Sequence, residues 1–422
     1  PPKPHEPRGA IMPRIIPVLI LSLTVCAPSF ATAAQAPRAI ALPQQGNAYT
    51  RYELLAPGSG KFRIVYNVTE TREGAKAFFN PIRKGSVSTD EKVTDLATGV
   101  SLKFAVVAGA SAKSPEFPDA DPALDYIRVE LARPVPANGG EGRIRIEKTY
   151  EDGKSYYLDG NEIVFDRTLY VKRNSIILPL HYALVSCNYP AQIEQDADGR
   201  IKVSLLNVTP ADAPVKLRAS LERRFSAAPT SVHDKLGERA SQTRDIVYFL
   251  RDPKTHSFDL YHDYTEERAG VGTYVNIVRS GSTASNPAAR NLDNGENLTA
   301  EILKGAAITA AGVSDPGLKT ISPDTEVVVF RFAPLAANQS IRLRMSETYT
   351  DAERYKLQGD ELIFDRTLGR PVNTVVLPPG WKLTNSAVPA VISELSDGRT
   401  RLDFLNPRLD EMGVLITARR AH

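Results

Sequence analysis

Charged residues recur at matching places in the two halves of the chain, and they are the first candidates for chemistry. The run Phe-Asp-Arg-Thr occurs at 165–168 and again at 364–367, and Thr-Glu-X-Arg occurs at 69–72 and 265–268. Arginine binds carboxylates and phosphates through a planar fork, whereas a buried charge without a partner is costly. Two interpretations follow. The charges pair to hold loops in place, which we favour, or they surround a loop-end pocket that binds a polar ligand once in each half.

The ligand-binding interpretation uses equivalent positions in both halves. Its candidate binding residues are Glu70, Arg83, Asp166 and Arg167, with the counterparts Glu266, Arg279, Asp365 and Arg366. Acid-base catalysis by carboxylates such as Asp166 or Glu162, in a secreted hydrolase of unfamiliar type, is a further hypothesis. The sequence has no G-x-S-x-G elbow, phosphate-binding loop or dinucleotide fingerprint, so we predict no nucleotide chemistry.

Aromatic residues offer a different kind of site, because exposed rings can stack on sugars. Trp381 is the only tryptophan, and it aligns with Tyr182 of the first half. Sixteen tyrosines are ordinary for a sheet protein, which favours core or strand-surface positions for the rings. A carbohydrate-binding accessory protein that uses Trp381 stays as an alternative.

Metal ligands and nucleophiles are sparse. The histidines follow no metal-binding spacing and there is no CxxC pair, so we predict no metal and no cofactor. His256 and His262, placed on one strand, would lie about 20 Å apart, and we expect His262 to be a packed core-edge imidazole. Calcium at Asp119, Asp121 and Asp125 or at Asp196 and Asp198 is conceivable, but loop solvation explains these acids as well. Cys187 aligns with Ser386, which indicates an incidental thiol.

The N-terminal segment has the features of an export signal. Arg14 precedes an apolar stretch at 15–25, and small residues follow at 31–33. The stretch is shorter than the roughly 20 residues that span a membrane, so residues 1–36 are interpreted as upstream residues plus a secretory signal peptide. We expect a secreted or periplasmic protein, with no membrane span after signal removal. The single cysteine that remains favours a bacterial-type exported chain.

Charge narrows the classes of partner. The chain carries 52 basic and 49 acidic side chains, a formal net charge of +3. A nearly balanced surface does not supply the positive field that nucleic acids or anionic membranes need. We therefore predict no nucleic-acid partner.

The strongest signal is an internal duplication. The segment 150–169 aligns with 349–368 at eleven identical positions out of twenty, with an offset of 199 residues. Earlier in the repeat the offset is 196, which predicts a three-residue length change in the loop at 109–124. We divide the chain into repeat 1 at 47–221, a linker at 222–243 and repeat 2 at 244–422.

Each repeat shows the period of two that is typical of half-buried strands. Apolar residues alternate with polar ones at 62–68, 143–146 and 215–219, and at the equivalent positions of repeat 2. Asp-Gly and Asn-Gly pairs between the strands are typical of tight hairpins. The fold class is therefore all-β, with tandem duplicated antiparallel β-sandwich modules. Helices are expected only at 232–241 and 299–304.

The functional prediction follows from these features. We expect an exported, non-catalytic tandem β-sandwich protein that acts through its surfaces in adhesion, assembly or envelope scaffolding. The predicted partner is a second copy of the chain or an envelope or matrix component, with a glycan as the alternative.

Overall fold

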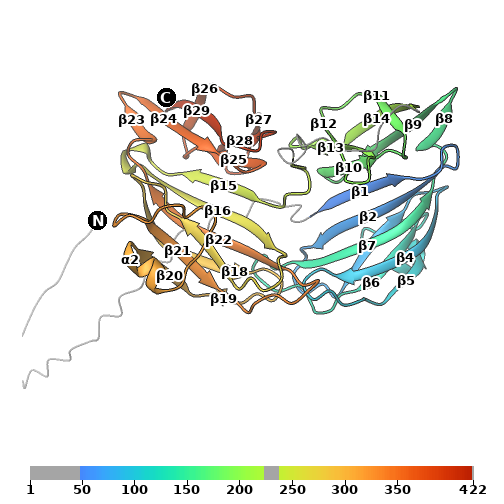
Figure 1. Cartoon of the computed structure of the whole chain (residues 1–422), viewed down its shortest axis with the longest axis horizontal. Coiled ribbons are helices and arrows are strands. Elements are labelled where there is room, and N and C mark those ends of the chain that lie inside the picture. The colour runs from blue at the N-terminus through green and yellow to red at the C-terminus, as the bar shows by residue number, and fades with distance from the viewer. Residues whose placement is uncertain (1–47, 223–236, 421–422) are drawn as a thin grey trace, which may run out of the picture. The chain divides into compact units, whose positions relative to one another are not determined.

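The computed structural model describes residues 48–222 and 237–420, which are coloured in Figure 1. The predicted signal peptide, the first half of the helix expected at 232–241, His233 and His422 lie outside the described residues. The described part of that expected helix, 237–241, is not helical. Within residues 48–222 and 237–420, no helix is both long enough and apolar enough to span a membrane.

Repeat 1 consists almost entirely of strands. In chain order these are β1 (Tyr49–Leu54), β2 (Lys61–Glu70), β3 (Ala77–Ile82), β4 (Val87–Asp95), β5 (Phe104–Ala108), β6 (Asp125–Glu130), β7 (Gly142–Glu151), β8 (Tyr156–Asp159), β9 (Glu162–Leu169), β10 (Arg173–Ile177), β11 (Tyr182–Cys187), β12 (Gln192–Gln195), β13 (Ile201–Leu206) and β14 (Ala213–Leu221). One short helix, α1 (Gly109–Ala112), follows β5.

Repeat 2 follows the same plan. Its strands are β15 (Asp245–Leu250), β16 (Ser257–Glu266), β17 (Thr273–Ile277), β18 (Thr283–Asn291), β19 (Asn297–Leu298), β20 (Ala300–Lys304), β21 (Glu326–Arg331), β22 (Ile341–Thr350), β23 (Tyr355–Gln358), β24 (Glu361–Leu368), β25 (Val372–Val376), β26 (Trp381–Ser386), β27 (Val391–Glu394), β28 (Thr400–Leu405) and β29 (Met412–Arg420). The short helices are η2 (Pro253–Thr255) and α2 (Ala306–Ala310).

Each repeat contains one large sheet covered by two smaller ones. In repeat 1 the large sheet has the order β12-β13-β10-β1-β2-β7-β4, and the smaller sheets are β11-β14-β9-β8 and β3-β6-β5. In repeat 2 the corresponding orders are β19-β18-β22-β16-β15-β25-β28-β27, β23-β24-β29-β26 and β17-β21-β20. Every sheet draws its strands from a single repeat (Figure 1). The chain is all-β and built of tandem β-sandwich modules, which confirms the predicted fold class.

The sandwich cores lie between the large sheet and its covers. In repeat 1 one core joins β1, β2, β10 and β13 to β9 and β14, and it includes Phe62, Phe165 and Val203, each of which is fully buried. A second core joins β2, β4 and β7 to β6 through residues such as Ile127 and Ile144. Because the alternating residues of each strand point to opposite faces, the predicted period of two translates directly into these cores.

Two details differ from the sequence-based expectation. Each large sheet contains one parallel pair, β1 with β10 and β15 with β25. A parallel pair needs a long crossover, which short-range turn signals do not reveal. The sequence predicts a helix at 299–304, but 300–304 forms β20, which pairs with β21. Helix α2 begins just after this strand. The pairing of β20 with β21 therefore outweighs the local helix preference of the segment.

The length change between the repeats is larger than predicted and is partly reversed. Asn80 pairs with Ile127 in repeat 1, and Asn276 pairs with Val328 in repeat 2. The offset therefore rises from 196 to 201 across the loop between β5 and β6, and it returns to 199 by β7. The offset thus rises from 196 to 201 and then falls to 199, and the sum of these two changes is the predicted net change of three residues.

The two repeats meet through matching segments. The backbone N–H of Glu141 donates to the carbonyl of Leu292 at 2.7 Å, and the N–H of Ser340 donates to the carbonyl of Ala97 at 3.3 Å. Glu141 and Ser340 are equivalent residues, and the two acceptors lie in equivalent turns after β4 and β18. Each repeat therefore contributes the same two segments, as in the self-complementary contact of a symmetric dimer.

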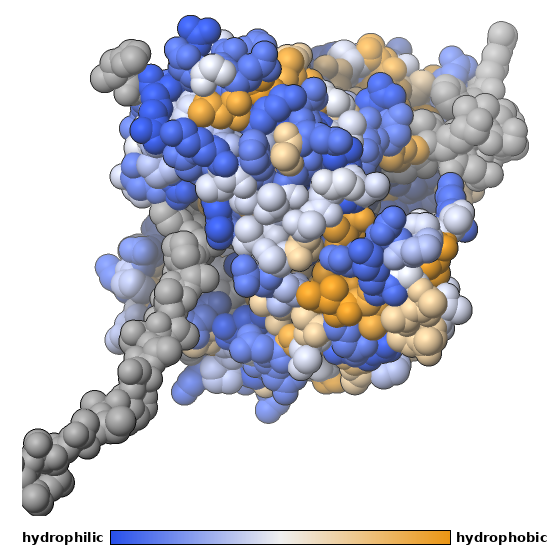
Figure 2. Space-filling model, turned by 90° about the vertical axis from the view of Figure 1, so that its left-hand side faces the viewer, coloured by the Kyte–Doolittle hydropathy of each residue, from blue (hydrophilic) through white to orange (hydrophobic). Residues whose placement is uncertain are grey.

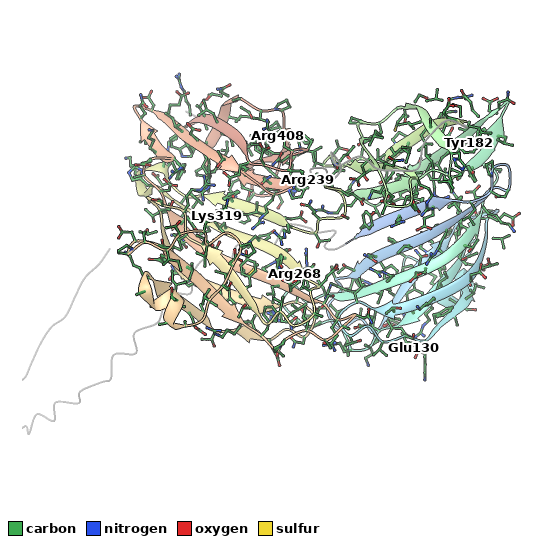
Figure 3. All side chains as sticks on the ribbon, viewed as in Figure 1. Glu130, Tyr182, Arg239, Arg268, Lys319 and Arg408 are labelled. Atoms are coloured by element: carbon green, nitrogen blue, oxygen red, sulfur yellow. The ribbon has the colours of Figure 1, made fainter. Side chains whose placement is uncertain are left out.

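The described end of the linker also contacts both repeats. Arg239, labelled in Figure 3, donates side-chain hydrogen bonds to the carbonyls of Asn406 at 3.2 Å and Gly369 at 3.1 Å, both in repeat 2. Its backbone N–H donates to Oε1 of Gln192 in repeat 1 at 3.0 Å.

Candidate functional sites

Arg167 and Arg366 lie at the centre of equivalent charge clusters. Nη1 of Arg167 lies 3.1 Å from Oδ2 of Asp152 and 3.2 Å from Oγ of Ser155. Its guanidinium also lies 5.4 to 6.0 Å from the ring centres of Tyr52, Phe62 and Tyr150.

Arg366 repeats this arrangement with Asp351 at 3.0 Å and with the equivalent three rings. In both repeats the arginine is therefore paired with a carboxylate and packed among three rings, and its removal would leave that carboxylate without this partner.

Arg83 joins the cluster of repeat 1 from the loop after β3. Its Nη1 donates to Oγ of Ser155 at 3.1 Å and lies 3.6 Å from Asp152. Burial alone would raise the pKa of Asp152, but hydrogen bonds from Ser155 and the charge of Arg167 outweigh it and lower the pKa. The counterpart Arg279 points elsewhere and donates to Thr367 at 2.7 Å and to Glu411 at 3.0 Å.

The remaining predicted carboxylates do not join these clusters. Asp166 pairs with Lys216 at 2.9 Å on the opposite face of β9, and both side chains are about half exposed. Glu162 pairs with Arg218 at 2.6 Å. Asp365 is exposed. Adjacent residues of a strand point to opposite faces, so Asp166 and Arg167 cannot line one pocket as predicted.

Glu70 and Glu266 are held by their own loops. Oε1 of Glu70 accepts from the backbone N–H of Arg72 at 2.9 Å, and Oε2 pairs with the Arg72 side chain at 2.7 Å. Glu266 binds Arg268 in the same way. Burial would raise the pKa of Glu266, but hydrogen bonds from Arg268 and Tyr264 lower it to about 2. The Thr-Glu-X-Arg runs therefore fix the chain direction after β2 and β16.

Trp381 lies in the core, as the favoured interpretation of its ring predicts, and the alternative of an exposed sugar-stacking ring is wrong. Trp381 is only 5% exposed, belongs to the core of repeat 2 and lies under Arg420. It begins β26 at an inward-facing position, so its ring is not available to stack on a sugar.

The histidines lie apart in different settings. His256 lies in the left-handed conformation at the end of η2, not on the strand where it was expected. His262 is buried as predicted, and burial together with the charge of Arg370 lowers its pKa to about 3. Among residues 48–222 and 237–420 no three His, Cys, Asp or Glu side chains are grouped to hold a metal ion. Asp196 pairs with Lys202 at 3.0 Å, and Asp198 pairs with Arg200 at 2.7 Å.

The edge strand β5 is a candidate protein-binding surface. It pairs with β6 on one side and ends its sheet on the other. Its sequence, Phe-Ala-Val-Val-Ala, has no charge, and Phe104 and Val106 are 38% and 56% exposed. Unpaired edge strands add strands from other chains unless charges or prolines block them.

The equivalent strand of repeat 2 carries such charges. Glu301 of β20 pairs with Arg331 at 2.7 Å, and Lys304 pairs with Asp324 at 3.7 Å. Repeat 2 also exposes apolar residues, and Ile302 is 52% exposed. Figure 2 views the molecule from the side of repeat 2 and shows hydrophobic residues gathered on that face. The difference between the two edges is therefore charge and not apolar exposure.

Repeat 1 also contains a pocket of about 510 Å³ between the large sheet and its covers. Its walls include Lys148 on β7, Arg83 and Lys84 after β3, Arg167 on β9, and the rings of Tyr66 and Tyr150. The pocket brings Arg83 and Arg167 together, as the ligand-binding interpretation predicted. Glu70 and Asp166 do not line it.

Lys148 is the pocket residue that sequence reasoning missed. It follows Ile144 and Ile146 in the alternation of β7, so it occupies a core-facing position, and it is 5% exposed. Its ammonium donates to Oδ1 of Asn80 at 2.6 Å and lies 5.1 Å from the ring centre of Tyr150. A charged residue at the inward position of a regular strand was the signal that could have identified it.

Three solved structures show a distant similarity to this chain. No family model matches the chain, and no curated protein matches it. An M1 zinc metallopeptidase from Deinococcus radiodurans matches at 11% identity and a TM-score of 0.28, over 41% of each chain. An aminopeptidase N family protein from Idiomarina loihiensis matches at 13% identity and a TM-score of 0.24, over 41% of this chain and 29% of that one.

A collagen adhesin from S. aureus matches at 9% identity and a TM-score of 0.16, over 76% of this chain and 86% of the adhesin. The matched region spans less than half the length of the two peptidases. Because all three TM-scores are low, nothing about the activity of this chain follows from these matches.

Proposed function

We propose that this is an exported, non-catalytic tandem β-sandwich protein that acts through its surfaces, in adhesion, assembly or envelope scaffolding. The observation that supports the proposal best is the edge strand β5, which carries no charge and has no partner on its outer side among the described strands. Strand addition at such an edge supplies main-chain hydrogen bonds, and the side chains on each face supply specificity.

The partner we propose is a second copy of the chain. An antiparallel pair of β5 strands related by a twofold axis at Val106 places Phe104 opposite Ala108 and Ala105 opposite Val107. No like charges face each other in this pair, because the strand contains none. An isologous contact requires this kind of self-complementarity. Because five residues bury little surface, the association is weak and depends on concentration.

Light scattering after size-exclusion chromatography tests the proposal. We expect the purified chain to shift from monomer toward dimer as its concentration rises, and Val106→Lys to abolish the shift. Ile302→Lys is the matched control, since it adds the same charge at the equivalent exposed position of β20, and it leaves the shift unchanged. A chain that stays monomeric at about 1 mM, the weak limit of specific association, contradicts the proposal, as does a Val106→Lys variant that dimerises normally.

A further inference from the structure

The pocket of repeat 1 has an unusual balance of charge. Four of the residues that line it are cationic, namely Arg83, Lys84, Lys148 and Arg167, and no carboxylate among the described residues lines it. Asp152 does not line the pocket, but it pairs with both arginines and neutralises part of their charge. Asp152 carries a single negative charge, which pairs with the arginines and does not compensate the charges of Lys84 and Lys148.

Lys148 carries the argument furthest. Its ammonium is buried, and among the described residues its hydrogen-bonding partner is the neutral amide of Asn80. It has no ion pair in the described part of the chain. Burial of a cation without an anion is costly, and proteins generally pair such charges. Burial and the charge of Arg167 lower the pKa of Lys148 to about 8, so the side chain is mostly protonated at pH 7.

Repeat 2 supplies an internal comparison at the same position. Glu347 replaces Lys148 and accepts a hydrogen bond from Nδ2 of Asn276 at 2.6 Å, where Asn276 is the counterpart of Asn80. An amide can accept from an ammonium or donate to a carboxylate, so the same Asn serves opposite charges. Ser280 replaces Lys84, and His262 replaces Tyr66. Repeat 2 retains the two arginines as Arg279 and Arg366 and has Arg370 at the position of Val171. The difference is therefore at the buried position itself, where repeat 1 has the cation Lys148 and repeat 2 has the carboxylate Glu347.

We propose that the pocket of repeat 1 binds a small organic anion, with Lys148 as counter-ion to its carboxylate or phosphate group and the tyrosine rings against its body. The volume lies within the range of small-molecule pockets, and Tyr52, Tyr66 and Tyr150 supply apolar walls. Arg83 lies at the open side, with its side chain 41% exposed, and adds a forked donor for the same group. This site goes beyond the proposed surface function and does not depend on β5.

Isothermal titration calorimetry at pH 7 and low salt tests the proposal with defined probes. The anions are 1-naphthoate, 1-naphthyl phosphate and glucuronate, and the uncharged counterparts are 1-naphthol and glucose. We expect at least one anion to bind saturably and its uncharged counterpart to bind more weakly. A preference for naphthoate or for naphthyl phosphate then distinguishes a carboxylate ligand from a phosphate ligand.

Two variants locate the binding. Lys148→Met keeps an unbranched side chain that is one atom shorter and removes the charge. We expect it to weaken binding by about tenfold or more, the usual effect of losing one charge-assisted hydrogen bond. Lys216→Met removes the same charge from the surface pair with Asp166 and leaves affinity unchanged. Lys148→Gln serves as a second variant, and circular dichroism confirms that each variant is folded. The proposal is overturned if no anion saturates, or if both Lys148 variants bind as the original chain does.

Discussion

Arg143 of β7 and Asp293, in the turn after β18, form a bidentate ion pair that joins the repeats. Nε of Arg143 lies 2.6 Å from Oδ1 of Asp293, and Nη2 lies 2.8 Å from Oδ2. The Arg143 side chain is closed to solvent, and Asp293 is 6% exposed. Oδ2 of Asp293 also accepts from the backbone N–H of Arg342 at 2.8 Å. Arg143 and Arg342 are equivalent residues, so one carboxylate holds the same position of both repeats.

Removal of that carboxylate should destabilise the protein strongly. Asp293→Ala leaves Arg143 buried without its anion, and we expect a loss of about 3 to 5 kcal/mol in the free energy of unfolding. Urea unfolding followed by circular dichroism measures it. Asp410→Ala, which breaks the exposed pair with Arg408, is the control and should change the free energy by less than about 0.5 kcal/mol. A small effect of Asp293→Ala would mean that the contact does not stabilise the chain.

Arg167 should matter for folding more than for recognition. Arg167→Ala removes the nearer of the two arginines paired with Asp152 and the cation close to three rings, and we expect about 3 kcal/mol of destabilisation. Arg366→Ala in repeat 2 should behave alike. Thermal unfolding measures both, with Lys216→Ala as an exposed control. If Arg167→Ala is as stable as the original chain and loses only the binding of an anion, the cluster is a binding site and its structural role is refuted.

The buried charge of Lys148 should make stability depend on pH. Its pKa in the folded state, about 8, lies below the unfolded value of 10.5, so between these values the unfolded chain binds more protons. Its contribution to stability therefore improves as pH rises from 8 to 10.5 and is unfavourable below pH 8. The charge of Arg167 adds to this lowering of the Lys148 pKa, and the charge of Glu91 opposes it.

We expect the free energy of unfolding of Lys148→Met to exceed that of the original chain by roughly 3 kcal/mol at pH 7. This difference should vanish near pH 10.5. Urea unfolding of both proteins across this range measures the difference. A constant difference would show that Lys148 is not buried as a cation.

Glu347 should give the opposite trend in repeat 2. Burial raises its pKa to about 7, against which the charge of Arg366 and the hydrogen bond from Asn276 act. Because the folded pKa lies above the unfolded value of 4.5, stability is full below pH 4.5 and declines as pH rises toward 7. Glu347→Gln should remove this decline, as measured by urea unfolding at pH 5 and pH 8. Equal pH dependence in both proteins would contradict the assignment.

Much of the architecture follows from local pattern. The duplication around Tyr150 and Tyr349, the period of two and the Asp-Gly turns predict short strands and two similar bodies, because side-chain alternation and turn geometry act over a few residues. The parallel pair of β1 and β10 could not be predicted in the same way, since its partners lie more than a hundred residues apart.

The candidate sites, like the architecture, were predictable from local pattern only in part. From the amino-acid pattern alone, Arg167 and Arg366 are equivalent positions that both repeats retain, and residues 104–108 carry no charge. That Arg167 meets Asp152 and not Asp166, that Trp381 is buried, and that Lys148 faces a pocket becomes visible in the folded chain. A side chain's partner depends on which strands become neighbours, and long-range pairing sets those neighbours.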